Sequence, residues 1–342
     1  MLNETNKAGV AGGTFVEDTN SKSQNQSSPL PLNESFSKKN PFLQTIWDAT
    51  SLGTLKECPR KYFLSIVQGW QPKQNAVALS FGILLHECLE NFYRREAEGM
   101  EREKNVRQTL RECLLSPIRE EIELAGDSVR NMKTLIVTLI DYLDFYAGEP
   151  AQTLIMKDGT VGVELHFQFE TGLKATSGEV FSISGNIDRI VQTPTGIFIL
   201  DHKTTSMPLS QYYFNQYDLD NQMTVYAIAG DVVYGTQVRG VLIDGIKVKG
   251  NPEFSRYMTM RSKEACDEWL EELEHWFRLA EYFSQVGNWP ANDKSCSKYS
   301  GCPFREICKA PRGLRQNLLE SGFQRRVWDA SKAREDKREG GN

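Results

Sequence analysis

Residues 185–205 read GNIDRIVQTPTGIFILDHKTT, and this stretch decides the fold of the chain. Val180–Val191 and Ile197–Asp201 are apolar runs that predict two β-strands, and the Thr-Pro-Thr-Gly sequence at 193–196 predicts the turn between them. Each strand carries an acid near the end of its apolar run. A hairpin would therefore bring Asp188 close to Asp201, and because strand side chains alternate, Lys203 shares a face with Asp201.

This arrangement of charges favours a metal site. Two carboxylates at one place are costly unless a cation lies between them, and a hard divalent cation fits. Lys203 could orient a water molecule or stabilise developing negative charge, and the backbone carbonyl of His202 is a plausible further ligand. An isolated Asp-x-Lys is more often a surface ion pair. Here the buried strand and the second acid favour a reactive site.

The remainder of the chain predicts an α/β fold with a central mixed β-sheet flanked by helices. Ser51 is a plausible N-cap for a first helix that runs through Phe63. A helical insertion is expected at 99–150. The other predicted strands are Val161–Phe169, Val238–Lys247 and Ser255–Met260, and the other predicted helices are 79–98, 102–125, 129–147, 211–230 and 263–286.

Composition sets the outer limits. The 342 residues are 39% hydrophobic and 25% charged, as in ordinary globular proteins, and the net charge of -5 does not exclude a local basic groove for nucleic acid. Residues 1–44 are rich in polar residues and predict a disordered tail, 45–310 one domain, and 311–342 a basic tail. The absence of a long apolar run or a signal-peptide pattern predicts a cytoplasmic protein with no membrane contact.

Two predicted helices carry polar residues at one-turn spacing. Gly82, His86 and Glu90 share a face, where Gly82 would permit a close backbone approach and His86 could bind a metal. A lone helical histidine is more often a hydrogen-bonded interior residue. Gln222 and Tyr226 form a second pair, which suits contacts to phosphates or bases. A partly buried helix face explains that pair equally well.

Four of the seven cysteines suggest a second metal centre. Cys296, Cys302 and Cys308 lie within thirteen residues in a loop at 290–310, and Cys58 lies in a Cys-Pro-Arg-Lys-Tyr segment far away in sequence. The common zinc spacing Cys-x2-Cys is absent, so four thiolates could hold either zinc or an iron–sulfur cluster. Spacing alone does not identify Cys58 as the fourth ligand.

Taken together, these motifs resemble the PD-(D/E)XK nuclease superfamily. The likeness is to its RecB-like branch, which includes iron–sulfur nucleases associated with CRISPR systems and the nuclease domain of AddB helicase–nuclease subunits. Six motifs stand in the family's order: Cys-Pro-Arg-Lys-Tyr at 58–62, Gly-x3-His at 82–86, Gly-x2-Asp-Arg at 185–189, Asp-x-Lys at 201–203, Gln-x3-Tyr at 222–226, and the cysteines at 296, 302 and 308.

The resemblance implies a role for each motif. His86, Asp188 and Asp201 would bind Mg²⁺ or Mn²⁺ with help from the His202 carbonyl, and Lys203 would be the catalytic lysine. Gln222 and Tyr226 would contact DNA or support the site. A [4Fe–4S] cluster would be held by Cys58, Cys296, Cys302 and Cys308. Glu164 loosely matches an accessory acid of the family.

The expected function is therefore that of a metal-dependent deoxyribonuclease, an exonuclease acting on single-stranded DNA or DNA ends. Recombination, repair, phage DNA processing and CRISPR adaptation are all open as pathways. No nucleotide-binding P-loop is present, so any unwinding would come from a helicase or another recombination or CRISPR partner. The alternatives are a non-catalytic DNA-binding scaffold subunit of a helicase–nuclease complex, and a zinc-stapled hydrolase of another phosphoester.

Overall fold

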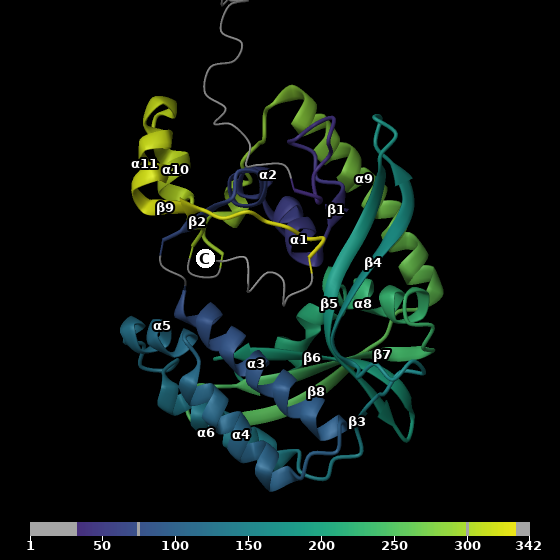
Figure 1. The fold of residues 1–342 in the computed structure, drawn as a ribbon. Helices are drawn as coiled ribbons and strands as arrows, with labels where there is room; N and C mark the ends of the chain where they lie inside the picture. The colour runs from purple at the N-terminus through teal and green to yellow at the C-terminus, as the bar shows by residue number, and fades with distance from the viewer. Residues whose placement is uncertain (1–32, 74–75, 299–300, 333–342) are drawn as a thin grey trace, which may run out of the picture.

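The computed structural model describes residues 33–73, 76–298 and 301–332. Within these ranges a mixed sheet of seven strands forms the centre of the molecule, and helices cover it (Figure 1). This confirms the predicted α/β class. The strands of the sheet are β1 (Ile46–Trp47), β3 (Gln152–Thr153), β4 (Val163–Lys174), β5 (Val180–Thr193), β6 (Gly196–Thr205), β7 (Val238–Lys247) and β8 (Glu253–Thr259).

Strand β5 organises the sheet. It pairs in parallel with β1 and antiparallel with β3, β4 and β6, so the predicted hairpin of β5 and β6 is present. Strand β6 then pairs in parallel with β7, which pairs antiparallel with β8. The parallel pair needs a crossover connection, and the helices between β6 and β7 supply it.

Two apolar cores hold helices against the sheet. The first packs Leu52 and Met223 against strand residues such as Ile199, and the second packs Phe81 and Leu139 around Ile246. The helices are α1 (Ala49–Glu57), α2 (Pro59–Tyr62), α3 (Val77–Ala97), α4 (Arg102–Leu115), α5 (Ile118–Ala125), α6 (Met132–Phe145), α7 (Gln211–Phe214), α8 (Asn221–Val232), α9 (Lys263–Val286), α10 (Arg305–Lys309) and α11 (Arg315–Gly322), with a π-helical turn at Phe63–Val67 and 3₁₀ turns at Asn215–Tyr217, Asp293–Ser295 and Arg312–Leu314.

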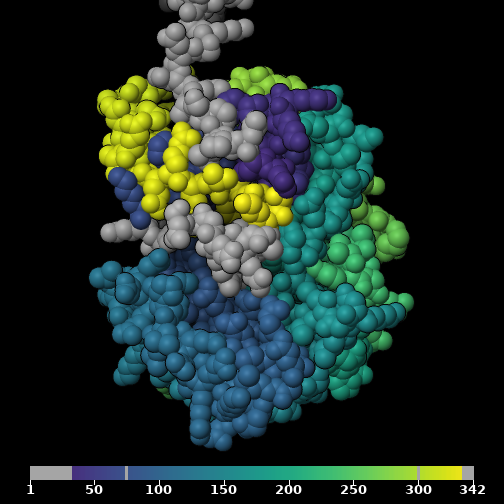
Figure 2. Space-filling model, in the orientation of Figure 1, coloured from purple at the N-terminus to yellow at the C-terminus, as the bar shows by residue number. Residues whose placement is uncertain are grey.

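The predicted helical insertion is present as α4, α5 and α6, which pack on α3 and occupy one end of the molecule (Figures 1 and 2). The predicted single helix at 102–125 is wrong. It breaks at Ser116, whose extended backbone precedes Pro117, because a residue before proline avoids the helical conformation. The predicted helix at 211–230 is likewise divided, and α8 begins after Asp220, whose carboxylate accepts from the Gln222 and Met223 N–H groups.

The first helix also differs from prediction. Asp48, rather than Ser51, is the N-cap, and Ser51 is the third helical residue of a reciprocal capping box. This helix does not reach Phe63, because Cys58 is extended and Pro59 starts a new helix. Strand β6 is longer than predicted, so Asp201 and Lys203 lie inside the strand rather than at its end.

Part of each predicted tail makes regular contacts with the domain in the described residues. Residues 33–44 pack into the core through Phe36 and Leu43, and residues 1–32 lie outside the described part. In the predicted basic tail, β9 (Phe323–Arg325) pairs antiparallel with β2 (Trp70–Pro72). The segment after β9 lies beside the first described residues (Figure 2), where Ser35 Oγ donates to Asp329 at 2.7 Å. Residues 333–342, and 299–300 of the expected cysteine loop, lie outside the description.

Candidate active site

Asp188 lies immediately beyond the last pair of the β5–β6 hairpin. Arg189 is opposite Leu200 in that pair, so Asp188 and Asp201 are the next residues along the two strands. Because the pairing stops there, the His202 N–H donates to Asp188 Oδ2 at 3.0 Å instead of to a strand carbonyl of β5. Both acids are buried. The structure thus brings together the two carboxylates that the hairpin predicts to be neighbours.

Lys203 is on the same face of β6 as Asp201 and contacts it. The Lys203 Nζ lies 2.6 Å from Asp201 Oδ2. Burial raises the pKa of Asp201 to about 6 against the opposing attraction of Lys203, and the charge of Asp188 raises it further. Burial would lower the pKa of Lys203, but Asp201 and Asp188 outweigh it and the pKa is raised. Lys203 is therefore a cation at neutral pH, held at the two acids.

His86 reaches the same place from helix α3. Its Nδ1 lies 3.3 Å from Asp188 Oδ2, and its side chain is 19% exposed. The predicted role of Gly82 in close approach is not needed, because a Cβ at that position would meet Thr204 Oγ1 at an ordinary 3.7 Å. Glu90, one turn beyond His86, is buried and accepts from Arg94 at 3.2 Å.

Gln222 and Tyr226 hold Lys203 from helix α8. Lys203 Nζ donates to Gln222 Oε1 at 2.8 Å, and Gln222 Nε2 donates to the Tyr226 hydroxyl at 2.9 Å. The Tyr226 hydroxyl in turn donates to the Asn186 carbonyl on β5 at 2.8 Å. Tyr226 is buried, so these contacts favour support of the site over stacking on a base.

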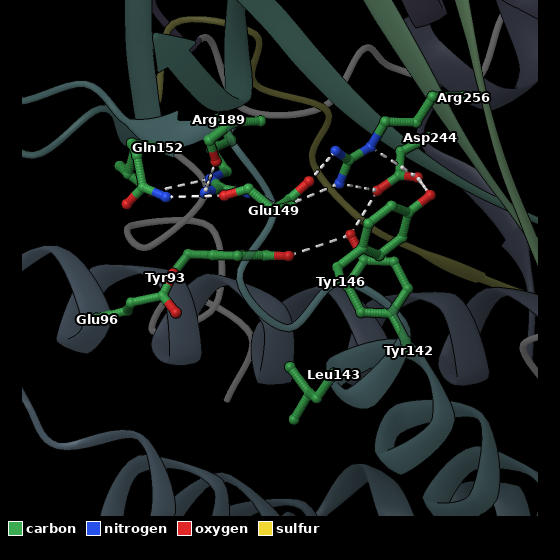
Figure 3. Close-up of polar contacts among 12 residues, drawn as sticks. Tyr93, Glu96, Tyr142, Leu143, Tyr146, Glu149, Gln152, Arg189, Asp244 and Arg256 are labelled. Atoms are coloured by element: carbon green, nitrogen blue, oxygen red, sulfur yellow. Dashed lines mark hydrogen bonds and ion pairs between the residues drawn. The ribbon is translucent and has the colours of Figure 1, made fainter. Parts of the chain in front are cut away.

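The side chain of His202 points to the opposite face, as alternation predicts, and enters a polar network that the sequence did not reveal. Its Nδ1 lies 3.2 Å from Asp244 Oδ2 on β7. Asp244 also accepts hydrogen bonds from the hydroxyls of Tyr142 and Tyr146 on the insertion side, and its Oδ1 lies 3.3 Å from Arg256 Nε (Figure 3). Apart from Tyr142 and Tyr146, which are one turn apart at the end of α6, these residues lie on separate elements, so no sequence spacing marks them as a group.

Glu164 lies beside the acids, in β4 between residues paired with Arg189 and Ile187. It shares a cavity of about 10 Å³ with His86 and Asp188. Its φ of 50° is a positive value at a residue other than glycine, a conformation that costs free energy and is common at functional sites. The structure therefore places Glu164 beside the two acids, and its role as an accessory acid stays a prediction.

The four motif cysteines lie in one region, beside the junction of α1 and α2. The Asn292 N–H donates to Cys58 Sγ at 3.3 Å, and the Cys296 thiol donates to the Asn292 carbonyl at 3.8 Å. Burial raises the pKa values of Cys302 and Cys308, and Cys58 is close enough to add to both shifts. The fold thus supplies what sequence spacing could not, a reason to group Cys58 with the other three.

The model of the PD-(D/E)XK nuclease superfamily matches residues 47–309. The chain belongs to this superfamily. The match spans the sheet, the insertion and all four motif cysteines, and nucleases of this superfamily generally use divalent metals such as Mg²⁺.

Solved structures give weaker likenesses. A protein from Eubacterium rectale that carries the provisional name of an exonuclease is 13% identical, with a TM-score of 0.43, 74% of this chain and 86% of that chain being covered. The protein SSO0001 is 16% identical, with a TM-score of 0.28, and the match covers 62% of this chain and 98% of that chain. Among curated proteins none matches the chain.

The donor atoms of this superfamily member suit a divalent cation by type. They are the carboxylates of Asp188 and Asp201, the imidazole of His86 and the backbone carbonyl of His202. Mg²⁺ and Mn²⁺ both bind ligands of these types. As arranged, no three His, Cys, Asp or Glu side chains in the described ranges already form a metal cage. The raised pKa of Asp201 shows that its buried negative charge is only partly offset, which is the condition a cation would relieve. In the same ranges no helix has the length and apolar content of a membrane span.

Proposed function

We propose that the chain is a metal-dependent deoxyribonuclease of the RecB-like branch, acting as an exonuclease on single-stranded DNA or DNA ends. The observation that carries the proposal is the opposition of Asp188 and Asp201 just beyond the hairpin pairing, with Lys203 bound to Asp201 at 2.6 Å. A scaffold protein would not need a buried carboxylate pair in which the pKa of Asp201 is raised, since an ionised Asp201 then lowers the stability of the fold.

In this proposal Mg²⁺ or Mn²⁺ would be bound by Asp188, Asp201, His86 and the His202 carbonyl. When bound, the cation would supply Lewis-acid polarisation of the scissile phosphate and a lowered pKa for the attacking water. Lys203 remains charged and lies beside both acids, so it places a positive charge where the phosphorane-like negative charge develops.

Gln222 and Tyr226 are positioning residues in this scheme. Gln222 accepts from Lys203 and is itself held by Tyr226, which is anchored on the Asn186 carbonyl of the Asp188-bearing strand. The lysine is therefore fixed relative to both acid-bearing strands, and little reorganisation is needed as charge develops on the substrate.

We also propose that Cys58, Cys296, Cys302 and Cys308 hold a [4Fe–4S] cluster. Four thiols and their shared location support the choice of an all-cysteine centre, and zinc is the competing occupant. The cluster would tie the α1–α2 junction to the 290–310 loop. Iron and acid-labile sulfide assays on anaerobically purified protein decide between them. Four irons and four sulfides per chain are expected, whereas stoichiometric zinc without sulfide would contradict the cluster.

DNA is the proposed partner, and a helicase or another recombination or CRISPR protein would provide any unwinding. Cleavage of end-labelled single-stranded DNA with Mn²⁺ tests the activity, comparing wild type with Asp201→Ala. The matched control is Asp267→Ala, which removes the acid of an exposed ion pair with Lys263 on α9. Cleavage by wild type and the control alone is expected. DNA binding without cleavage in wild type would favour the non-catalytic scaffold.

A further inference from the structure

A chain of charged and polar contacts runs behind the proposed metal site, from the strand of one acid to the strand of the other; Figure 3 shows the part from Arg189 to Asp244. It starts at the residue after Asp188 and ends at the residue after Asp201. We call it the charge chain: its charged members in order are Arg189, Glu149, Arg256 and Asp244, and it ends at the imidazole of His202.

Each link in the charge chain is a direct contact. Arg189 Nη1 lies 3.5 Å from Glu149 Oε1, and Arg256 forms an ion pair with the same carboxylate. Arg256 Nε then lies 3.3 Å from Asp244 Oδ1, whose other oxygen lies 3.2 Å from His202 Nδ1. Four members belong to β5, β6, β7 and β8. Glu149 alone comes from outside the sheet, in the segment after α6.

Burial makes the geometry of the charge chain restrictive. The side chains of Arg189 and Asp244 are 1% and 0% exposed, and those of Glu149 and Arg256 are 13% and 17% exposed. A buried charge that loses its partner is strongly destabilising, so the strands can shift only as far as the ion pairs allow. Arg189 is fixed further by stacking over Tyr93, with its guanidinium 3.5 Å from the ring centroid.

We propose that Glu149 sets the spacing of Asp188 and Asp201, so that the helical insertion acts as a positioning element of the metal site. This inference rests on the proposed nuclease function. Glu149 is the anion between Arg189 and Arg256. Without it, two cations remain next to each other and repel, which displaces Arg189 and the adjacent Asp188. Groups that orient metal ligands typically change metal affinity by about 10–100-fold.

The test measures Mn²⁺ binding to the full chain without DNA, and the electron paramagnetic resonance signal of free Mn²⁺ is the readout. Glu149→Gln keeps the shape and removes the charge, and we expect about a tenfold or greater increase in the Kd for Mn²⁺. The matched control is Glu281→Gln. Glu281 is also a buried carboxylate, paired with Arg278 at 3.2 Å on α9, and contacts no member of the charge chain. The control should bind Mn²⁺ as wild type does.

The outcomes separate the two proposals. If wild type does not bind Mn²⁺, the proposed metal site fails, and the positioning role with it. If wild type binds and Glu149→Gln binds equally well, only the positioning role is overturned. Should Glu149→Gln not fold, Glu149→Asp, which keeps the charge on a shorter side chain, is measured instead. Weaker Mn²⁺ binding by that variant supports the proposal, and wild-type binding contradicts it.

Discussion

Asp201 and Asp244 are buried carboxylates on neighbouring strands whose surroundings act in opposite directions. His202 lies opposite Asp244 in the β6–β7 pairing and Asp201 one residue before it, so the two acids face opposite sides of the sheet. Burial raises the pKa of Asp201 to about 6. Burial also opposes ionisation of Asp244, but hydrogen bonding to His202 and the charge of Arg256 more than offset it and lower the pKa to about 2.

The difference distinguishes a site for chemistry from a structural support. Asp244 has its partners within the protein and is stable as an anion. For Asp201, burial is the main cause of the raised pKa; the attraction of Lys203 offsets it only in part, and the charge of Asp188 raises the pKa further. A carboxylate left in this condition favours a cation that the chain itself does not provide. In the proposed nuclease, one face of β6 would present reactive groups, and the other would hold them in place.

The largest expected effect is on cleavage. Asp201→Asn removes a proposed metal ligand, and the rate of DNA cleavage should fall by about a thousandfold or more. The measurement is single-turnover cleavage of end-labelled DNA with Mn²⁺. Retention of the wild-type rate would show that Asp201 and Lys203 form an ion pair without a catalytic role.

Asp244→Ala should act on stability. It leaves Arg256 and the two tyrosine hydroxyls without their common acceptor, and breaking such a buried pair costs about 3–5 kcal/mol. Urea unfolding at pH 7 measures the loss. A change below 1 kcal/mol, within the range of surface substitutions, would contradict the view that this face is the structural support.

The two acids should also give opposite pH dependences in metal-free protein. The folded-state pKa of Asp201 is raised, so its ionisation destabilises the fold as pH rises from about 4 to 6. Asp201→Asn should therefore gain stability relative to wild type over that range. The pKa of Asp244 is lowered, so its contribution is present above pH 4 and is lost as pH falls toward 2. The stability of Asp244→Asn should therefore approach that of wild type as the pH falls. Urea unfolding in the presence of a chelator across pH 3–8 measures both pH dependences. If the unfolding free energy of both variants followed that of wild type in parallel over this range, the contrast between the two acids would be refuted.

A smaller effect is expected at the support of Lys203. Gln222→Ala removes its acceptor, and we expect about a tenfold slower cleavage at saturating Mn²⁺. Gln216→Ala is the control, because Gln216 donates to the Tyr213 carbonyl at 2.7 Å and makes no hydrogen bond to Lys203 within the described part of the chain. Equal rates for the two variants would mean that Lys203 is positioned without Gln222.

The sequence predicted which side chains meet on the Asp201 face of β6 better than those on the Asp244 face, for a physical reason. Asp188, Asp201 and Lys203 lie on one hairpin, where the strand period and a short turn determine which side chains meet. The Asp244 network unites residues from β6, β7, β8 and the insertion, and only the tertiary fold brings them together. Hydrophobic spacing, which predicted the helices and strands, contains no information on such polar contacts.

The element boundaries failed where local chemistry outweighed apolar spacing. Asp48 replaced Ser51 as N-cap because its carboxylate reaches the Ser51 N–H at 2.7 Å. The tails were predicted from polar composition, yet a few apolar residues such as Phe36 and Leu43 are sufficient to fix residues 33–44 on the core. Cys58 could be grouped with the C-terminal cysteines only by the resemblance or by the fold.

The most direct measurement is a Mn²⁺ titration of DNA cleavage by Asp201→Asn and Asp244→Asn side by side. Asp201→Asn should cleave about a thousandfold or more slowly than wild type at every Mn²⁺ concentration. Asp244→Asn should need more Mn²⁺ but approach the wild-type maximal rate, because it retains every proposed ligand. Full cleavage by Asp201→Asn, or an Asp244→Asn variant that is folded and equally inactive at saturating Mn²⁺, would contradict the division between a reactive and a supporting face.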